Sequence, residues 1–561
     1  MSLLDWSVLI GTLLFITLYG VYKTRGSQSM ESYLMGDKSL KWWTIGLSIM
    51  ATQASAITFL STPGQAYEDG MRFIQFYFGL PIAMVILSVT VIPIYYRLKV
   101  YTAYEYLEGR FDLKTRSLTA LLFLIQRGLA AGITIYAPAI ILSTILGWPL
   151  SNTCFLIGVL VIIYTVSGGS KAVSVTQKQQ MMVMMGGMII AGIMVVNYLP
   201  DSITFGKAIQ VAGDMGKLNM VDFSFNPNDR YNIWSGLIGG LFVALAYFGT
   251  DQSQVARYLG GKSLTESRLG LLFNGLLKIP MQLLILFIGA MVFVFYQFYQ
   301  PPVFFNQAAT EIVRSSEWKT DFEDLEQKHT QLFEQKQDKI QALLLAREQG
   351  QEAEAESLRA DIKGIESQSK AVKAEVVSLV KKANPDAEPK DTDYVFITFI
   401  MNHLPQGLVG LLLAVIFSAA MSSTSSELSA LGSTTLVDMY KRNIRPSASD
   451  GHYLKASRAF TALWGFIALT FAVYASMLDN LIQAVNILGS IFYGTMLGIF
   501  LVAFYFKKIG GNSVFYAALV AEAVVVYFFF MTDIGFLWYN VIGCLGVIVL
   551  SSVLQVTVFR R

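Results

Sequence analysis

Ten of the 18 residues in the stretch SAAMSSTSSELSALGSTT, positions 418–435, are serine or threonine, and Glu427 lies among them. The stretch continues the apolar run GLVGLLLAVIF, so it predicts the end of one long helix. Several of its serines recur at helical spacing and share one face: Ser422, Ser425, Ser426, Ser429 and Ser433. Such a face can pack closely against another membrane helix, or it can offer neutral oxygens to a cation that must later be released.

Charged residues inside other apolar runs are the next candidates, because charges within a membrane span usually serve function. Arg127 lies in FLIQRGLAAG and Asp251 in ALAYFGTDQSQ, and Lys278 follows Asp251 by 27 positions. The guanidinium of Arg127 matches a carboxylate group, but it can equally pair with another helix. Asp251 and Lys278 can pair with each other or contact a solute. Glu427 and Lys178 can pair or remain separately solvated near the inner end of the bundle.

Membrane helices must position these residues. The chain has 561 residues, of which 54% are hydrophobic and only 14% charged, whereas about a quarter of the residues in a soluble domain are charged. Residues 73–96 contain no charged side chain and are long enough to cross about 30 Å of hydrocarbon. The expected partner is a lipid bilayer and not a nucleic acid, because the basic residues flank apolar runs. Cys154 and Cys544 lie in apolar runs and predict buried free thiols.

Thirteen apolar runs predict an all-α polytopic membrane protein with about 13 transmembrane helices. They cover approximately residues 4–22, 43–66, 73–96, 117–147, 153–167, 180–199, 232–258, 270–298, 404–440, 458–476, 480–506, 512–531 and 535–558. Alternate connections should be basic, and the basic ones are Lys23/Arg25; Arg97, Lys99, Arg110, Lys114 and Arg116; Lys171/Lys178; Arg257, Lys262 and Arg268; Lys441, Arg442 and Arg445; Lys507/Lys508; and Arg560/Arg561. This alternation places the N-terminus outside and the C-terminus inside.

Residues 305–393 interrupt the pattern, because they are rich in Glu, Lys, Gln and Ala with spaced Leu and Ile. They predict an extracytoplasmic hairpin of two soluble helices that turns near Gly350. Long loops cross the membrane largely regardless of charge, so the hairpin does not contradict the topology. It is either a solvated spacer or a docking arm for an extracytoplasmic protein partner. The following segment YVFITFIMNHLPQG is too short for a span and predicts an outer-surface helix.

Two spans carry signs of interruption. The second contains MATQASAITFLSTPGQAYEDG, with Pro63-Gly64 near its outer end, and the seventh has Gly249 before Asp251. Spans two to six and seven to eleven then form two sets of five in opposite orientation, each with a broken first helix, as in inverted-repeat secondary transporters. The predicted units are an extra N-terminal helix (1–30), a first repeat (40–200), an extracytoplasmic loop (201–231), a second repeat (232–304 and 394–508), the hairpin (305–393) and two C-terminal helices (509–561).

Four segments resemble the sodium:solute symporter family, which includes sodium–glucose, proline, sialic acid and iodide carriers: SAAMSSTSSELSALGSTTLVDMYKR, ATQASAITFLSTPGQAYEDG, VSGGSKAVSVTQKQQ and TDQSQVARYLGGKSL. The resemblance covers the membrane part and leaves out the hairpin, which indicates a bacterial-type member with an added hairpin. ITIYAPAIIL and TPGQAYEDG are similar to the branch of iodide, monocarboxylate and vitamin carriers, whereas TDQ with Lys278 is similar to sugar carriers. The substrate branch stays open.

The resemblance implies sodium as the coupling ion, held by two backbone carbonyls at the break of the second span and by oxygens of the hydroxyl-rich helix. The implied ligands are Ala51, Ala54, Ala419, Ser422 and Ser423. Some members hold a second sodium, for which the matching positions besides Ser422 are Ser425, Ser426 and Gln177. The family has an acid where this chain has Gln177, and Lys178 follows it, so we expect one sodium per cycle.

Approximate alignment with the family places further residues at the solute cavity: Ser55, Thr58, Phe73, Gln252 and Gln483, beside the charged candidates Arg127, Asp251 and Lys278. The resemblance implies a sodium-coupled symporter, multi-pass in a bacterial inner membrane, that imports a sugar, a sialic acid or a monocarboxylate by alternating access. We do not expect an enzyme, because the sequence has no catalytic triad, phosphate loop or metal spacing. The alternatives are a transporter-like membrane sensor that uses the hairpin, and a proton-coupled carrier that uses Glu427 or Asp251.

Overall fold

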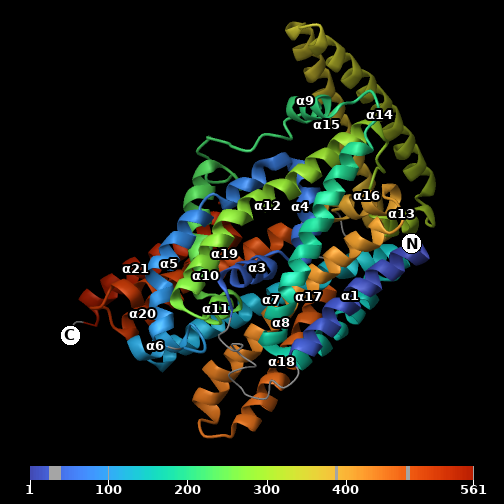
Figure 1. Ribbon diagram of the computed structural model, residues 1–561. Coiled ribbons are helices and arrows are strands. Elements are labelled where there is room, and N and C mark those ends of the chain that lie inside the picture. Colours follow the sequence, from blue (N-terminus) through green and yellow to red (C-terminus); the bar gives the residue numbers. More distant parts are fainter. Residues whose placement is uncertain (25–39, 99, 386–389, 475–480, 560–561) are drawn as a thin grey trace.

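The computed structural model describes residues 1–24, 40–98, 100–385, 390–474 and 481–559 (Figure 1). Its first helices are α1 (Leu3–Thr24), α3 (Trp42–Gln53), α4 (Ala56–Asp69), α5 (Leu80–Leu98), α6 (Glu105–Arg110), α7 (Leu113–Leu146), α8 (Leu150–Asn197), α9 (Phe205–Asp214), α10 (Gly240–Thr250), α11 (Gln252–Leu259) and α12 (Leu264–Phe298). The later ones are α13 (Gln307–Arg314), α14 (Lys319–Glu348), α15 (Glu352–Ala383), α16 (Val395–His403), α17 (Leu408–Thr434), α18 (Asp450–Tyr474), α19 (Leu481–Tyr505), α20 (Gly511–Met531) and α21 (Leu537–Thr557). Short 3-10 or π segments are η1 (Gly70–Tyr77), η2 (Ser235–Gly239), η3 (Thr392–Tyr394) and η4 (Thr435–Ile444).

The described residues confirm the all-α, multi-pass class. Nine of their helices are long and apolar enough to cross a membrane, and shorter apolar helices cover Leu3–Tyr19, Leu150–Ile163 and Ser235–Thr250. Helix forms at each predicted span, although α8 contains both the fifth and the sixth. Some sequence predictions lie outside the described residues: those for Arg25, Lys99, Arg560, Arg561 and the junction of the tenth and eleventh spans.

Both predicted helix breaks are present, and each falls beside the residues expected to do chemistry. α3 ends at Gln53 and α4 begins at Ala56, because the intervening Ser55 has an extended backbone. α10 ends at Thr250, and the extended backbone of Asp251 starts α11. Pro63 lies inside α4 and does not end it. The pairing of the two sets of five helices as inverted repeats stays a prediction.

Three connections that the charge pattern places on one side lie together at the end of the bundle that carries α6 (Figure 1). Glu108 of α6 forms ion pairs with Arg116 (2.7 Å) and with Arg442 (2.6 Å), which belongs to the connection after α17. Arg110 donates to the backbone oxygen of Phe506 at 2.9 Å, after α19. These bonds support a common side for the three basic connections, while the side that faces the cytoplasm stays a prediction.

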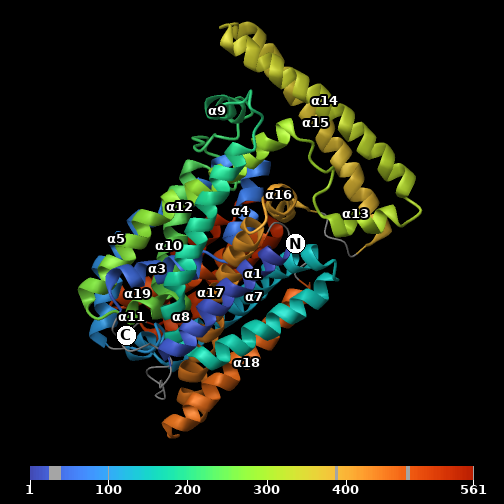
Figure 2. The same cartoon turned by 45° about the vertical axis from the view of Figure 1, so that its right-hand side comes forward.

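The inserted hairpin has the expected form. α14 and α15 run antiparallel, and Gly350 at the turn has φ +69°, a left-handed conformation that glycine adopts without strain. The hairpin and α9 project from the same end of the bundle (Figures 1 and 2). Arg347 and Arg359 of the hairpin both donate to Asp214 at the end of α9, at 2.9 and 2.5 Å. The hairpin is therefore fastened to a neighbouring loop.

The predicted short helix after the hairpin exists as α16, while its position at the outer surface of the membrane stays a prediction. Its residues from Val395 to Ile400 are all buried. Phe399 packs edge-on against Phe295 of α12, with ring centroids 5.1 Å apart. This short apolar segment therefore packs against the helix bundle.

Candidate functional site

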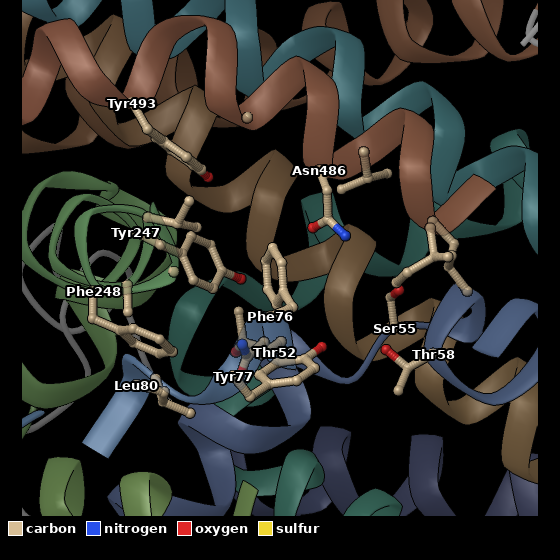
Figure 3. A pocket seen from close by; sticks show the side chains of 18 of the residues that line it. Thr52, Ser55, Thr58, Phe76, Tyr77, Leu80, Tyr247, Phe248, Asn486 and Tyr493 are labelled. Carbon is tan, nitrogen blue, oxygen red and sulfur yellow. The ribbon is translucent and has the colours of Figure 1, made fainter. Parts of the chain in front are cut away.

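A cavity of about 90 Å³, measured as the space open to the centre of a water molecule, lies beside the break between α3 and α4. α5, α7, α10, α17, α19 and η1 supply the rest of its wall. Aromatic rings form much of the lining, and Figure 3 shows Phe76, Tyr247 and Asn486 pointing into the same space. Ser55 and Thr58, at the start of α4, also line it, as predicted from the resemblance. The cavity thus combines apolar faces with a few polar groups, as solute sites usually do.

The hydroxyl-rich face of α17 lies against the first break. Ser422 Oγ donates to the backbone oxygen of Ala51 at 3.2 Å, and Ser423 Oγ donates to that of Ala419 at 2.9 Å. Ala54 caps the end of α3, and its backbone N–H donates to Met50. Ala51 and Ala54 therefore belong to the last turn of a helix whose carbonyls lack the partners that a continuing helix would supply.

These groups fit a sodium ion. The carboxyl end of α3 carries a partial negative charge, and neutral carbonyl and hydroxyl oxygens are the donors that unwound transporter helices offer to sodium. Ala51, Ala54, Ala419 and Ser423 are fully buried, and Ser422 is 1% exposed, so water competes little. No group of three or more His, Cys, Asp or Glu that could hold a metal occurs in the described part of the chain.

The position of the possible second sodium holds an amide instead. Gln177 of α8 places its Nε2 at 2.9 Å from Thr52 Oγ1 and at 3.0 Å from the hydroxyl oxygens of Ser422 and Ser426. The Gln177 Oε1 accepts a hydrogen bond from Ser48. Ser425, the other predicted ligand, donates to the backbone oxygen of Ser422 at 3.2 Å. A hydrogen-bond donor thus points at the hydroxyls that a cation would need.

At the opposite wall of the cavity, Arg127 of α7 joins two carboxylates. It forms ion pairs with Asp251, at the second break, and with Glu427 of α17 (3.1 Å). Asp251 also accepts from Tyr493 OH at 2.8 Å and from the backbone and hydroxyl of Ser253 at 2.8 and 2.6 Å. Glu427 accepts from Arg127 and from the Thr134 hydroxyl, and its Oε2 has no hydrogen-bond partner among the described residues. Asp251 is therefore held by more hydrogen bonds than Glu427.

Comparison with known proteins identifies the chain's relatives. A sequence model described as "Sodium:solute symporter family" matches residues 33–317 and 374–521. The chain belongs to this family. The match leaves out residues 318–373, which form most of the α14–α15 hairpin. Membership makes the chain a multi-pass integral membrane transporter and supports sodium-coupled symport as its class of activity.

Individual relatives differ in their substrates. The symporter is 25% identical to a sodium/sialic acid symporter of Proteus mirabilis, over 98% of this chain and 94% of that one. It is 27% identical to sodium-coupled monocarboxylate transporter 1 of Mus musculus, over 88% of this chain and 68% of that one. Its match to the human sodium/iodide cotransporter, 33% identical, covers 48% of this chain and only 42% of that relative. A solved sodium-coupled sialic acid symporter, substrate-bound and outward-open, shares the fold with TM-score 0.76 and 23% identity, covering 99% and 98% of the two chains.

Two predicted charge pairs do not form. Glu427 pairs with Arg127 and not with Lys178, whose Nζ lies 4.4 Å from the ring centroid of Trp43. Asp251 pairs with Arg127 and not with Lys278. The cause is the rotation of the helices about their axes, because α7 carries Arg127 between the second break and α17. The spacing of residues along the sequence does not show how each helix is rotated about its axis.

Lys278 of α12 is fully buried, and its Nζ has no hydrogen-bond partner among the described residues. Its ammonium group lies 5.4 Å from the ring centroid of Tyr77, a contact that attracts a cation to an aromatic face. Tyr77 lines the cavity, but Lys278 does not. Lys278 is therefore separated from the cavity by an aromatic ring.

Three other predicted cavity residues lie elsewhere. Phe73 stacks on Phe76 and so supports the wall from behind. Gln252 accepts from the backbone N–H of Ala103 at 3.1 Å and donates to a neighbouring carbonyl, so it fastens the second break to a connection. Gln483 donates to Gln65 at 3.0 Å and accepts from Arg230. Gln65, Gln483 and Arg230 form a hydrogen-bonded polar closure near the C-terminal end of α4.

Several lining residues were not predicted: Gln53, Phe76, Tyr77, Gln126, Tyr247, Phe248, Asn486 and Tyr493. Three of them carry polar atoms without hydrogen-bond partners among the described residues, namely Gln53 Oε1, Gln126 Oε1 and Asn486 Nδ2. The sequence offered a signal for some of them, because Tyr247 and Phe248 directly precede Gly249 at the second break. Gln126 is the neighbour of the predicted Arg127.

Proposed function

We propose that this symporter imports a small polar organic acid, of the monocarboxylate or sialic acid type, together with one sodium ion, by alternating access across a bacterial inner membrane. The observation that carries the proposal is the position of Arg127, which lines the cavity with two carboxylate partners, of which Glu427 keeps one oxygen without a hydrogen bond among the described residues. A sugar is the second candidate, because the unpaired amide groups of Gln53, Gln126 and Asn486 suit hydroxyl groups.

The acid would replace Glu427 at the guanidinium. One guanidinium neutralises one carboxylate. The cluster of Arg127, Asp251 and Glu427 therefore carries one uncompensated negative charge at a buried site. Asp251 keeps its bonds from Tyr493 and Ser253. Glu427 has fewer bonds to lose and contacts Arg127 through one oxygen only, so a solute carboxylate that makes a bidentate contact displaces it at the smaller cost.

The sodium ion would bind where Ser422 and Ser423 meet the carboxyl end of α3. Each hydroxyl now donates to a carbonyl oxygen, at 3.2 Å for Ser422 and 2.9 Å for Ser423. A bound sodium needs those oxygens as ligands, so the hydroxyl hydrogens must turn away from the carbonyls. The ion then joins α3 to α17, and separation of the two helices releases it. Because the ligands are neutral, they hold the ion weakly enough for it to be released in each transport cycle.

Gln177 supports one sodium per cycle. Its amide nitrogen donates to Ser422 and Ser426, two of the predicted ligands of the second sodium, and to Thr52, so these hydroxyl oxygens are already used as acceptors. We expect the two broken helices, α3–α4 and α10–α11, to lead two inverted sets of five helices that rock against each other. One charge moving through 100 mV contributes about 2.3 kcal/mol. An acid imported with one sodium moves no net charge, so the sodium concentration ratio alone drives it.

Purified full-length symporter in liposomes tests this function. An inward sodium gradient should drive accumulation of labelled lactate, pyruvate or N-acetylneuraminate, and replacement of sodium by choline at fixed pH should abolish it. Accumulation of glucose and of none of the acids would overturn the acid and favour the sugar. Equal uptake in choline would overturn sodium coupling in favour of protons, for which Glu427 with its unpaired oxygen is the candidate site. Sodium-dependent binding without any uptake would favour a sensor.

A further inference from the structure

A second cavity lies at the base of the hairpin, outside the membrane bundle. It has about 130 Å³ open to the centre of a water molecule. The outer end of α4 forms one wall with Tyr67 and Glu68, and the end of α12 forms another with Phe293. The hairpin completes the cavity with residues of both α14 and α15, among them Lys336 and Lys370. The insertion therefore builds part of this cavity.

The charge of the lining is positive. Lys217, Lys336, Lys370 and Lys373 face it, against two acids, Glu68 and Glu366. Lys373 is already neutralised, because Asp391 lies 2.7 Å from its Nζ. An excess of one positive charge remains after this pair and the two glutamates are counted.

Two of the ammonium groups lack full compensation. Lys336 has no ion pair among the described residues, and burial lowers its pKa although Glu366 acts in the opposite direction. Burial likewise lowers the pKa of Lys217, whose Nζ donates to the backbone oxygen of Glu68 at 2.6 Å and lies 4.3 Å from the ring centroid of Phe293. Both lysines are half-buried, and a partly desolvated cation in such surroundings is stabilised by an anion.

α4 connects the second cavity to the central one, because Thr58 lines the central cavity and Tyr67 lines the second one. Nine residues of helix separate these positions, which is about 14 Å along the axis. The polar closure of Gln65, Gln483 and Arg230 contains a residue of the same helix between them.

We propose that this second cavity, the antechamber, binds a small carboxylate anion and loads the central cavity from outside. The ammonium groups of Lys336 and Lys370 would hold the carboxylate as charge-assisted donors, and the aromatic ring of Phe333 would pack on its carbon chain. Binding in the antechamber does not depend on the proposed function. The loading role rests on it, because it requires a transported acid.

Fluorine NMR of trifluoroacetate tests binding, with full-length protein in sodium-free buffer. The wild type should broaden the trifluoroacetate signal, and the Lys336→Gln/Lys370→Gln variant should reduce that broadening about threefold or more, because two cationic groups are lost. Lys339→Gln is the matched control, since Lys339 is one turn along α14 and pairs with Asp361 at 2.7 Å instead of lining the antechamber. Asn486→Phe, which fills the central cavity, should leave the broadening unchanged.

Equal broadening by the lysine double variant and the wild type would overturn binding in the antechamber. A loss of broadening in Lys339→Gln as large as that in the double variant would also overturn it, because it would indicate an effect of general surface charge. Loss in Asn486→Phe alone would assign the signal to the central cavity. For the loading role, the double variant should raise the apparent KM for acid uptake with kcat unchanged. An unchanged KM would overturn loading, and absence of any uptake by the wild type would overturn the proposed function while the NMR result stands.

Discussion

The two helix breaks are similar in backbone but opposite in chemistry. At the first, between α3 and α4, the meeting groups are neutral: carbonyl oxygens of α3 and hydroxyls of α17 such as Ser422. At the second, between α10 and α11, Asp251 takes part in an ion pair with Arg127 and accepts three further hydrogen bonds. Both places are buried, so the same low dielectric acts on each.

This difference suits the first break to release of an ion and the second break to retention of its contacts. A buried charge that loses its partner is costly, so the second break is suited to remain assembled through a cycle. Hydroxyl–carbonyl bonds contribute little each and exchange easily, so the first break is suited to take and give up an ion. The comparison therefore predicts large effects on stability at the second break and large effects on sodium dependence at the first.

The largest effect is expected for Arg127→Gln, which leaves Asp251 and Glu427 as two uncompensated buried carboxylates. The free energy of unfolding should fall by about 3–5 kcal/mol. Adding Glu427→Gln should recover part of the loss, because Asp251 keeps its bonds from Tyr493 and Ser253. Thermal unfolding in detergent with and without the second substitution measures this. No recovery in the double variant would show that the two carboxylates do not share the arginine.

The next effect concerns sodium. In Ser422→Ala/Ser423→Ala two hydroxyl ligands are lost, and each ligand is worth about 1 kcal/mol or more, so the sodium concentration for half-maximal uptake should rise by about tenfold or more. Ser433→Ala is the matched control, because Ser433 also donates to a carbonyl of its own helix, at 3.0 Å, and lies about three turns along the helix from Ser422 and Ser423. Solute accumulation that is undiminished in the double variant contradicts the proposed sodium site.

Local sequence features predicted the neutral break better than the charged one. The serine spacing, the small residues before Ser55 and the hairpin turn at Gly350 are all properties of short segments, and the structure has the predicted elements there. The partner of Arg127 is not a local property, because Asp251 is 124 positions away and Glu427 is 300 positions away. Which of several buried charges meet depends on helix rotation and packing.

The same limit explains Gln252 and Gln177. Both are polar residues at positions that match the family's sites, and only the fold shows that Gln252 binds a connection whereas Gln177 enters the hydroxyl cluster. The sequence alone shows that position 177 lacks the family's acid, but it does not show that the amide of Gln177 enters the hydroxyl cluster. The aromatic lining was equally hidden, because aromatic residues occur in every apolar span of this chain, so that the presence of Phe76 does not single it out.

A third change tests whether a charge can be brought to the neutral break. Gln177→Asp replaces the amide donor by a carboxylate near the hydroxyls of Thr52, Ser422 and Ser426, which completes the oxygen set of a second cation site. The sodium dependence of uptake should change from a Hill coefficient near 1 to a value between about 1 and 2. Gln177→Asn, which keeps the amide, should leave it near 1. A coefficient already well above 1 in the wild type contradicts the single sodium.

The smallest effect is expected at Lys278, a buried charge that belongs to neither break. Lys278→Met keeps the length of the side chain and removes an ammonium group whose only partner among the described residues is the face of Tyr77. The free energy of unfolding should rise by about 1 kcal/mol, because replacement of a poorly compensated charge by an apolar group of similar volume is neutral or stabilising. Lys278→Ala should instead destabilise, since it leaves a cavity. Uptake should persist in Lys278→Met, because an aromatic ring separates this residue from the solute. Loss of uptake with a raised KM would instead place Lys278 at the solute in another state of the cycle.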